Sequence, residues 1–486
     1  MNKEEHIDKA KVLAEKWLNE SQHHVTSHEK EFKAKVKKML SHPEDKLLLL
    51  HLMDQSFRPE SSARISDQIT YLLEKYGIAG FFGEGEKMLV RLFLIFGKYF
   101  PSVAIPQIIQ RIREQTEHVI IGGEKAPLYR FLNKCKKEKI RANLNILGEA
   151  ILGEAEAKKR LDRYIEALED PEVAYISVKI SSIYSQVHVL AFEETVKALS
   201  ERLTILYRAA MANLYKQQDG RKVPKFVNLD MEEYRDLALT VKAFQYTLDK
   251  PEFKHHYAGL VLQAYLPDAY AWQQTLTQWA IERVNQGGSP IKIRLVKGAN
   301  MEMELLEASI RDWPLATFDH KTDTDANFKR MVAYAFDPNH TPHVHIGLAS
   351  HNLFDVAYAK ILATEHNVMP YVTFEMLEGM SDSIRKVISK EHDMLVYAPV
   401  AAKADFVNAI AYLVRRLDEN TAPNNFLRHS FHLTPHSSSW NFLADQFAMS
   451  FDAIPHLSLE ANRKQNRLTE SFSLEAGSFT TGKFKK

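Results

Sequence analysis

The hydrophobic residues of this chain follow two patterns, and the change between them falls near residue 138. Before it, apolar residues recur at helical spacings, as at Leu13 and Trp17 and in the amphipathic segment Ile65–Tyr76, which stops at Gly77. Spacings of three and four residues predict helices throughout residues 1–137, because they place apolar side chains on one helix face. We therefore expect an all-helical N-terminal region.

From about residue 140, short β-branched or apolar runs alternate with longer helical segments such as Glu154–Glu169 and Ala269–Asn285. Eight runs are candidate strands: Ala142–Gly148, Tyr175–Ser181, Phe226–Met231, Ala258–Tyr265, Ile291–Val296, His343–Leu348, Pro370–Phe374 and Met394–Ala398. Alternating strands and helices predict a parallel sheet. Eight regular units favour closure into a (β/α)8 TIM-type barrel over an open doubly wound sheet. No GxGxxG follows a candidate strand, so a Rossmann dinucleotide site is not expected.

This alternation predicts three segments: a helical arm and accessory region over 1–137, a barrel over 138–430, and a partly disordered extension over 431–486. The 63 Lys and Arg nearly balance the 62 Asp and Glu, which argues against a nucleic-acid-binding surface. Cys135 is the single cysteine, so a reducing compartment is expected. The N-terminus lacks an apolar signal core, and charges and prolines interrupt the most apolar run, Met88–Ile109. We expect a soluble, cytoplasmic protein.

Most candidate strands have polar residues near their carboxyl ends. These residues are Asn145, Glu149, Lys179, Asp230, Gln263, Arg294, Lys297, His351, Asn352, Glu375 and Tyr397. Strand carboxyl ends meet at one mouth of a (β/α)8 barrel, where the chemistry of such barrels lies. Each residue alone has a simple structural explanation, such as helix capping by Asp230. Together they predict an active or binding site at this mouth of the barrel. The pair His343 and His345 begins a late strand without a clear acidic partner, so no metal site is expected.

The fifth candidate strand ends in Arg294, Lys297, Gly298 and Ala299. The glycine would let a ligand approach the backbone closely, and the two cations suit an anionic group. Downstream, the run from Lys321 to Asp325 supplies the hydroxyls of Thr322 and Thr324 and opens a helix over Asn327–Ala335. Free N–H groups at a helix start, with hydroxyls, can hold a phosphate, although helix capping explains the same residues.

A two-arginine segment, YLVRRLDE, covers Tyr412–Glu419 and predicts a short helix. Tyr412, Arg415, Arg416 and Glu419 share one side of it, because they are spaced by three and four residues. Adjacent arginines suit a carboxylate or a phosphate. By itself the segment is typical of a solvated surface helix, but it follows the eighth candidate strand and so belongs near the barrel mouth.

These runs together resemble a known family. YISVKIS, FVNLDM, LVLQAY, IRLVKGANMEME, LASHN, FEMLEGM, VYAPV and YLVRRLDEN are similar, in this order, to the proline dehydrogenase module of bifunctional proline utilization A (PutA) flavoenzymes. The likeness runs from about Asn143 to Phe426, and SDQITYLLEKYGIAGFF resembles the helical region that precedes the barrel in that family. The resemblance implies a distorted barrel whose last helix sits over the mouth. It also implies FAD-dependent oxidation of L-proline to Δ1-pyrroline-5-carboxylate, the first step of proline catabolism to glutamate, with electrons passed to a quinone.

The same resemblance implies roles for individual residues. The positions that would form the substrate pocket are Glu149, Lys179, Asp230, Leu377, Tyr397, Tyr412, Arg415 and Arg416. The two arginines and Lys179 would hold the proline carboxylate, and Asp230 would support Lys179. Tyr397 and Tyr412 would shape the pocket, with Leu377 as an apolar wall. Glu149 would pair with Arg415 and close the pocket.

On the flavin side, the resemblance places Arg294 near the reactive ring nitrogen and Gln263 at the edge of the isoalloxazine. The other positions implied to bind FAD are Val296, Lys297, Gly298, Ala299, Thr322, Thr324, His351, Asn352, Arg416 and Glu419. Two departures from the family pattern are Asn300-Met301, where many relatives have an aromatic pair, and Asn145, where an Asp is frequent.

The resemblance leaves several questions open. The implied quinone acceptor would allow peripheral association with the inner membrane. The N-terminal helices would allow homo-oligomerisation. No segment resembles the DNA-binding domain or the NAD-dependent semialdehyde dehydrogenase module of PutA proteins, so we expect a truncated bifunctional protein or a monofunctional relative. Two alternative functions remain: a Schiff-base aldolase-type barrel that uses Lys179 or Lys297, and a non-catalytic helical scaffold.

Overall fold

The computed structural model describes residues 3–464, apart from 41, 58, 60, 81, 149–150, 152, 218, 422–424 and 431–432. At residues 28, 32–33, 36–37, 39–40, 43, 54, 98, 411, 415 and 417–421 the description covers the backbone alone. The chain forms two compact units. Unit 1 comprises Met1–Glu15, Ile151–Glu375 and Asn441–Lys486, and unit 2 comprises Lys16–Ala150 and Met376–Trp440.

Six strands that lie in unit 1, the last of them ending two residues beyond its boundary at Glu375, are parallel and follow each other in sheet order. They are β3 (Tyr175–Lys179), β6 (Phe226–Asp230), β7 (Gly259–Gln263), β8 (Ile291–Val296), β9 (Val344–Ala349) and β10 (Val372–Leu377). Their register aligns the last residues of β3 and β6, Lys179 and Asp230, and pairs Gln263 at the end of β7 with Val296 at the end of β8. Parallel pairing therefore brings the carboxyl ends of these strands to one edge.

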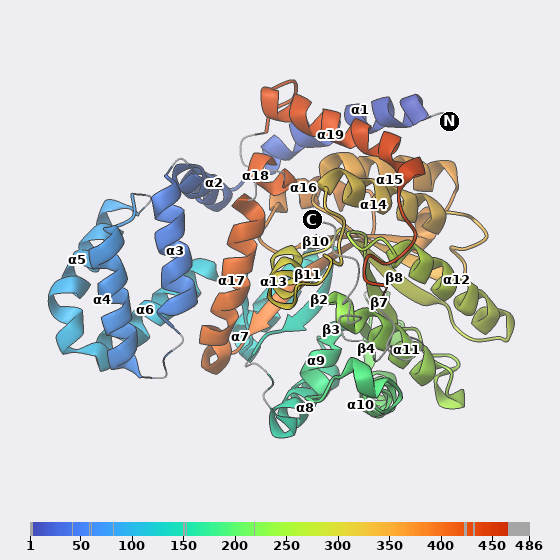
Figure 1. Ribbon diagram of the computed structural model, residues 1–486, viewed down its shortest axis with the longest axis horizontal. Helices are drawn as coiled ribbons and strands as arrows, with labels where there is room; N and C mark the ends of the chain where they lie inside the picture. Colours follow the sequence, from blue (N-terminus) through green and yellow to red (C-terminus); the bar gives the residue numbers. More distant parts are fainter. Residues whose placement is uncertain are drawn as a thin grey trace, which may run out of the picture. The chain divides into compact units, whose positions relative to one another are not determined.

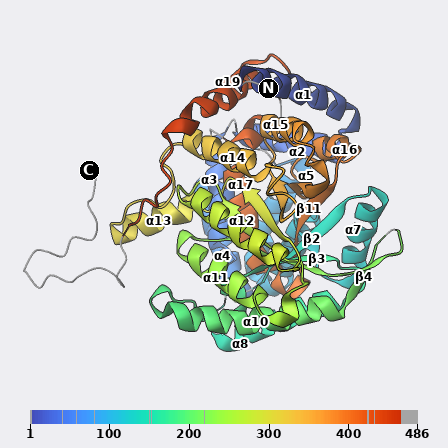
Figure 2. The same ribbon diagram turned by 90° about the vertical axis from the view of Figure 1, so that its right-hand side faces the viewer.

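Helices cover the outer side of these strands. They are α8 (Glu154–Glu169), α10 (Phe192–Ala212), α11 (Leu237–Leu248), α12 (Ala269–Asn285), α14 (Lys321–Ala335) and α15 (Leu353–Glu365). Helix α13 (Met301–Arg311) follows β8 and precedes α14 in the chain. Helix α10 contacts β6, α12 contacts β7, and α14 contacts β8, an arrangement that Figures 1 and 2 show. In α10, Leu199, Leu203, Leu206 and Ala210 are fully buried at spacings of three and four residues, which is the stripe that fixes a helix on a sheet. A further helix, α19 (Ser438–Ala453), packs Phe447 on Phe354 of α15.

Unit 2 contains most of the N-terminal helices. They are α2 (Ser27–Leu40), α3 (Pro43–Gln55), α4 (Ser62–Tyr76), α5 (Glu84–Phe96), α6 (Pro101–Thr116) and α7 (Lys125–Lys137), while α1 (Lys3–Ser21) spans the division between the units. Figure 1 shows α3 to α6 beside α17 (Phe406–Thr421). Leu48, Ile69 and Phe93 of these helices share a hydrophobic core with Ile410 and Leu413 of α17.

Unit 2 also holds three strands, β1 (Ile121–Gly122), β2 (Arg141–Ile146) and β11 (Met394–Ala401). Strand β11 pairs in parallel with β2 and with β1. In sheet order, the strands from β2 through β3 and β6 to β11 are eight parallel neighbours, and the pairing of β11 with β2 closes them into a barrel. The predicted fold, a (β/α)8 barrel preceded by a helical region, is confirmed.

Several predicted boundaries differ from the structure. The short strand β1 interrupts the helices expected over 1–137, because Ile121 and Gly122 pair with Val400 and Ala401 of β11. The helix expected from Asn327 begins six residues earlier, at Lys321. After α10, an antiparallel hairpin of β4 (Leu214–Lys216) and β5 (Lys222–Pro224) appears where the sequence predicted no strand. Each described helix is too short or too polar to cross a lipid bilayer.

Candidate active site

A cluster of buried charges lies between strands β8 and β10. Along β8, side chains alternate between the two faces, so Lys292 and Arg294 share one face, opposite the fully buried Ile293. Glu375 of β10 binds both cations: its Oε2 is 2.5 Å from Nε of Arg294 and its Oε1 is 2.6 Å from Nζ of Lys292. Gly347 of β9 leaves room for this pair, because a Cβ there would overlap Oε1 of Glu375. The sequence indicated Glu375 as a strand-end residue but did not suggest that it pairs with Lys292 and Arg294.

The electrostatics of this cluster favour the charged carboxylate. Burial by itself would raise the pKa of Glu375, but the charges of Arg294 and Lys292 outweigh it and lower the pKa. A buried carboxylate is stable in its charged form only with close partners, since taking a lone charge out of water costs several kcal/mol. Glu375 therefore neutralises two neighbouring cations and fixes the guanidinium of Arg294 inside the barrel.

A second carboxylate, Asp230 at the end of β6, holds the other side of Arg294. Its Oδ1 lies 3.3 Å from Nη1 of Arg294 and accepts hydrogen bonds from Ser177 Oγ (2.9 Å) and Asn228 Nδ2 (3.1 Å). The donors come from β3, β6 and β8, so Asp230 ties three strand ends together. The structure shows Asp230 in contact with Arg294, and its expected support of Lys179 stays a prediction.

The ammonium of Lys179 is paired with Glu232, a residue that the sequence interpretation missed. Its Nζ lies 2.7 Å from Oε1 of Glu232, whose Oε2 also accepts a hydrogen bond from Ser181 Oγ. The main-chain carbonyl of Glu232 accepts from Gln263 Nε2 (3.3 Å) and from the side-chain amide of Asn300. The loop after β6 therefore connects the ends of β3, β7 and β8. The available signal was the acidic pair that follows FVNLDM in the sequence.

Gln263 at the end of β7 is 2% exposed and has an unused acceptor. Its Nε2 donates to Glu232, but among the described residues its buried Oε1 has no hydrogen-bond partner. A buried amide oxygen without a donor is costly, by about 1–3 kcal/mol, so such an atom indicates a donor supplied by a ligand or a water.

A network of alternating charges joins the end of β8 to α14 and α15. Nζ of Lys297 lies 2.5 Å from Asp325 and 2.6 Å from Asp355. Asp325 also pairs with Lys321, and Asp355 lies 2.9 Å from Nζ of Lys329. Burial opposes charge on Lys297, yet the two carboxylates outweigh it and raise the lysine's pKa. Lys297 was expected to line the flavin, and the structure shows that its ammonium is already held by two carboxylates.

The other predicted flavin residues surround this network. Thr322 and Thr324 lie in the first turn of α14, which begins without a side-chain cap from His320. Gly298 has φ +130°, and the position of a Cβ there is filled by the ring of Tyr265. A close protein contact therefore already requires this glycine, whereas the sequence suggested close approach of a ligand. Val296 ends β8, Ala299 follows Gly298, and His351 and Asn352 lie between β9 and α15, where the Asn352 side chain accepts from the backbone N–H of Phe354.

The other residues expected in the substrate pocket, besides Lys179 and Asp230 of unit 1, lie in unit 2. Tyr397 is on β11 and Leu377 ends β10. Tyr412 is half-buried on α17, and the guanidinium of Arg416, 9% exposed, lies 5.0 Å from the centre of its ring. Arg415 and Glu419 lie on the same helix, but their side chains are outside the described part of the chain, and so is all of Glu149. The expected closure of the pocket by Glu149 and Arg415 stays a prediction.

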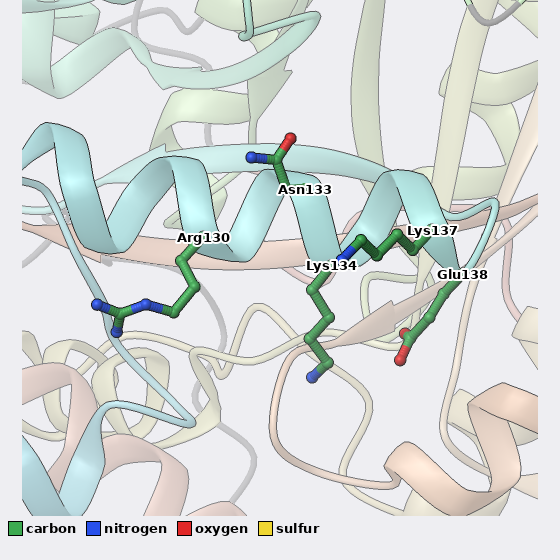
Figure 3. Close-up of a pocket in the computed structure, with 5 residues that line it drawn as sticks. All are labelled: Arg130, Asn133, Lys134, Lys137 and Glu138. Atoms are coloured by element: carbon green, nitrogen blue, oxygen red, sulfur yellow. The ribbon is translucent and has the colours of Figure 1, made fainter.

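One surface hollow lies away from these strand ends. It runs along α7 and is lined by Arg130, Asn133, Lys134, Lys137 and Glu138 (Figure 3). All five side chains come from α7 and the residue after it, and Lys134 Nζ lies 3.6 Å from Glu378 and 3.9 Å from Asp382. The hollow is therefore a charged surface groove with an ion-pair network, and we assign it no catalytic role.

Comparisons with known proteins agree with this architecture. A model of the proline dehydrogenase family matches residues 129–429. The proline dehydrogenase of Deinococcus radiodurans is 24% identical over 324 residues, which cover 65% of this chain and 90% of that protein. PutA from Corynebacterium freiburgense is 34% identical with a TM-score of 0.65, and the match covers 80% of this chain and 37% of that one. PutA from Bdellovibrio bacteriovorus is 26% identical with a TM-score of 0.75, and the match covers 92% and 44%.

The chain thus spans less than half the length of these two PutA proteins. The family match nevertheless covers more than half of the chain and includes every barrel strand from β2 to β11. It also includes the strand ends that carry Lys179, Asp230, Gln263 and Arg294. This chain belongs to the proline dehydrogenase family and corresponds to the proline dehydrogenase module of PutA.

Proposed function

We propose that this chain oxidises L-proline to Δ1-pyrroline-5-carboxylate, with FAD as the hydride acceptor and a quinone as the final electron acceptor. The proposal rests on the polar side chains at the carboxyl ends of the barrel strands, in a chain that belongs to the proline dehydrogenase family. Lys179, Asp230 and Gln263 end β3, β6 and β7, and Arg294 lies near the end of β8 with its guanidinium held by two carboxylates.

The residues at these strand ends suit a flavin. The buried Oε1 of Gln263 is an acceptor that the N–H of an isoalloxazine ring would satisfy. The uncapped start of α14, with the hydroxyls of Thr322 and Thr324, suits a phosphate. When bound, FAD supplies the hydride-accepting ring, a chemistry that no side chain offers. Arg294 would bring its positive charge to the ring, with its side chain fixed by Glu375.

On the substrate side, we propose that Arg415, Arg416 and Lys179 bind the carboxylate of proline. Two guanidinium groups and one ammonium would fix the ring carbon that loses its hydride, and such orientation accounts for much of the rate of a transfer reaction. The contact between Arg416 and the ring of Tyr412 supports this role, because it limits the freedom of the guanidinium before substrate binds. Tyr397 and Leu377 would form the remaining walls. Water can accept the amine proton.

The Schiff-base alternative has weaker support. A lysine that attacks a carbonyl must be neutral, and such lysines have pKa values lowered by burial or by nearby cations. The pKa of Lys297 is instead raised by Asp325 and Asp355, so this amine stays protonated. Lys179 is ion-paired with Glu232. Neither lysine is placed as a nucleophile.

The experiment that tests the proposal is a visible absorption spectrum of the purified protein, recorded without oxygen before and after L-proline is added. We expect a yellow protein whose flavin bands bleach with proline and return with a soluble quinone. A protein that binds FAD but is not bleached by proline would overturn the substrate, and a protein that cannot be reconstituted with FAD would overturn the cofactor. N-propargylglycine, with which the Bdellovibrio bacteriovorus PutA was inactivated, should also inactivate this chain.

A further inference from the structure

The segment that follows α19 reaches helix α13 and is fixed there by two side chains. The side-chain amide of Asn462 donates to the carbonyl of Thr317 (2.9 Å), and Nε of Arg463 donates to the carbonyl of Pro314 (2.8 Å). Both carbonyls belong to the connection between α13 and α14. Figure 2 shows the chain running from α19 to α13. Since the match to the family model ends at residue 429, the barrel here receives side chains from a segment outside that match.

The guanidinium of Arg463 is held from several sides. Its Nη1 lies 2.9 Å from Oε2 of Glu307, and its Nη2 lies 3.9 Å from Oε2 of Glu304. The rings of Trp313 and Tyr234 have their centres 5.4 Å and 5.8 Å from the guanidinium carbon. Two carboxylates and two aromatic rings thus restrain one cation, whose side chain is 12% exposed. The position of Arg463 is therefore fixed before any ligand binds.

Glu304 connects this arginine to the barrel mouth. Its side chain is 1% exposed, and its Oε1 accepts a hydrogen bond from the backbone N–H of Tyr234 (2.6 Å). Its Oε2 accepts no hydrogen bond within the described part of the chain and has Arg463 as its cation. Burial raises the pKa of Glu304, and the hydrogen bond from Tyr234 and the charge of Arg463 oppose this shift. Arg463 therefore supports the charged carboxylate that holds Tyr234.

The backbone of Tyr234 belongs to the connection between β6 and α11. We call residues 231–236 of this connection the β6 loop. Two residues before Tyr234, the carboxylate of Glu232 binds Nζ of Lys179, and the carbonyl of Glu232 accepts a hydrogen bond from Gln263. A shift of the β6 loop would therefore move one side chain that is expected to bind substrate and one that is expected to bind the flavin.

Helix α13 holds the β6 loop at two points. Asn300, just before the helix, donates its side-chain amide to the carbonyl of Glu232, and Glu304 accepts from the N–H of Tyr234. Asn300 and Glu304 are four residues apart, so both reach the loop from the same side of the helix. Asn300 also belongs to the dipeptide at which this sequence departs from the aromatic pair of many relatives. The contact between α13 and the β6 loop is therefore built partly from a residue that many relatives lack.

We propose that Arg463 is a positioning residue: it holds α13 and Glu304 in the place from which they fix the β6 loop, and it thereby orients Lys179 and Gln263. All of these residues belong to unit 1. The inference rests on the proposed oxidation of proline for the roles of Lys179 and Gln263, whereas the effect of Arg463 on the loop is independent of that reaction. Orientation matters because a displacement of about 1 Å can cost roughly a hundredfold in rate.

The first test is hydrogen exchange of the full chain, with neither flavin nor proline added. In Arg463→Met, the peptide that contains the β6 loop should exchange at least about tenfold faster, because Glu304 loses its cation and the loop loses its support. Arg463→Lys keeps the charge and should retain most of the protection. Arg311→Met is the matched control: Arg311 lies 3.5 Å from Glu307 and 4.8 Å from the ring centre of Trp313, and it should leave the loop unchanged.

A double variant separates this role from simple packing. Glu304→Gln keeps a side-chain oxygen that can accept from the N–H of Tyr234, but the neutral amide needs no cation beside it. Arg463→Met/Glu304→Gln should therefore recover wild-type exchange in the β6 loop. If Arg463 only packs on Trp313, Glu304→Gln cannot restore that exchange. Lack of recovery, or normal exchange of the loop in Arg463→Met, would overturn the proposal.

The consequence for the active site is measured with FAD and proline. Arg463→Met should bind FAD about threefold to tenfold more weakly and raise the KM for proline by a similar factor, the loss expected for one misplaced hydrogen bond at each ligand. Arg311→Met should change neither value. A loosened β6 loop with unchanged binding of both ligands would overturn the positioning role. A wild-type flavin that proline does not bleach would instead refute the proposed oxidation, and the exchange of the loop would still decide whether Arg463 fixes it.

Discussion

The Nε atom of Arg294 lies 2.5 Å from Oε2 of Glu375, and both side chains are almost completely buried, at 5% and 1% exposure. The same carboxylate binds Lys292 at 2.6 Å. One negative charge therefore keeps two buried cations on a single strand in place. If it is removed, both cations remain in a region that is poor in water, and their repulsion is no longer balanced by this carboxylate.

We expect Glu375→Gln to lower the free energy of unfolding by about 3–5 kcal/mol at neutral pH, as is usual when one partner of a buried ion pair is removed. The pKa of Glu375 is lowered in the folded chain. Its stabilisation is therefore present above the unfolded pKa, ~4.3, and is lost as pH falls through the folded pKa. Urea unfolding at several pH values should show wild type and variant converging in acid.

The control for this prediction is Glu252→Gln. Glu252 pairs with Arg208 on the surface, where the two side chains are 41% and 62% exposed. Exposed pairs contribute little, so the unfolding midpoint should not change measurably. Equal effects of the two variants would contradict the importance of the buried cluster.

A second prediction concerns Gln263 and the flavin. Gln263→Leu removes the acceptor Oε1 and should weaken FAD binding roughly tenfold, the value of one neutral hydrogen bond. Gln263→Glu keeps an acceptor at the same place but cannot donate to the carbonyl of Glu232. Reconstitution of the deflavinated protein with FAD measures both. Weaker binding by the Glu variant than by the Leu variant would contradict an acceptor role.

A third prediction concerns Gly298. Gly298→Ala should destabilise the protein by more than about 2 kcal/mol, because the new Cβ overlaps the Tyr265 ring and φ is +130°. Gly220→Ala is the matched control: φ is +88° there, but no atom lies within 4 Å of the new Cβ. It should cost about 1 kcal/mol from backbone strain alone. Thermal melts compare the two, and partial rescue of Gly298→Ala by Tyr265→Leu would confirm the overlap.

The barrel could be predicted because its strands are short apolar runs between clear helices, a pattern that depends only on neighbouring residues. The position of Arg294 near a strand end followed from the same pattern. Its partner Glu375 is 81 residues away, and nothing local to either residue links them. Lys297 likewise meets Asp325 and Asp355 only in the folded chain.

The missed elements have physical reasons of their own. The hairpin strand Leu214–Lys216 has three residues, two of them exposed, so it carries no apolar alternation that a sequence pattern could detect. Strand β1 has two residues and forms because Ile121 pairs with Val400 of β11, which is distant in the sequence. Glu232 was overlooked because it follows the strand end by two residues, and strand-end patterns emphasise Asp230 instead.

A fourth prediction tests the proposed carboxylate site. Arg415→Met and Arg416→Met should each raise the KM for proline roughly tenfold to a hundredfold, the loss expected for a charge-assisted hydrogen bond. Binding of FAD should weaken more in Arg416→Met, because the resemblance assigns Arg416 to both ligands. Steady-state kinetics with a quinone acceptor and FAD titration separate the two effects. An unchanged KM in both variants would refute the role of this arginine pair. Arg428→Met, a half-buried arginine of the next helix, is the control.

The last prediction concerns two histidines whose pKa values are lowered to about 4. Burial and then the charge of Lys292 lower the pKa of His345, and burial and then Arg283 lower that of His256. The unfolded chain would bind protons at these rings near pH ~6.5, whereas the folded chain does so only near 4. The free energy of unfolding should therefore fall as pH drops through this window, by up to roughly 3 kcal/mol for each histidine.

His345→Gln should flatten the dependence, and His255→Gln, at an exposed ring, should leave it unchanged. Urea unfolding at pH values between 4 and 7 measures the slope, and equal slopes in wild type and His345→Gln would refute the assignment.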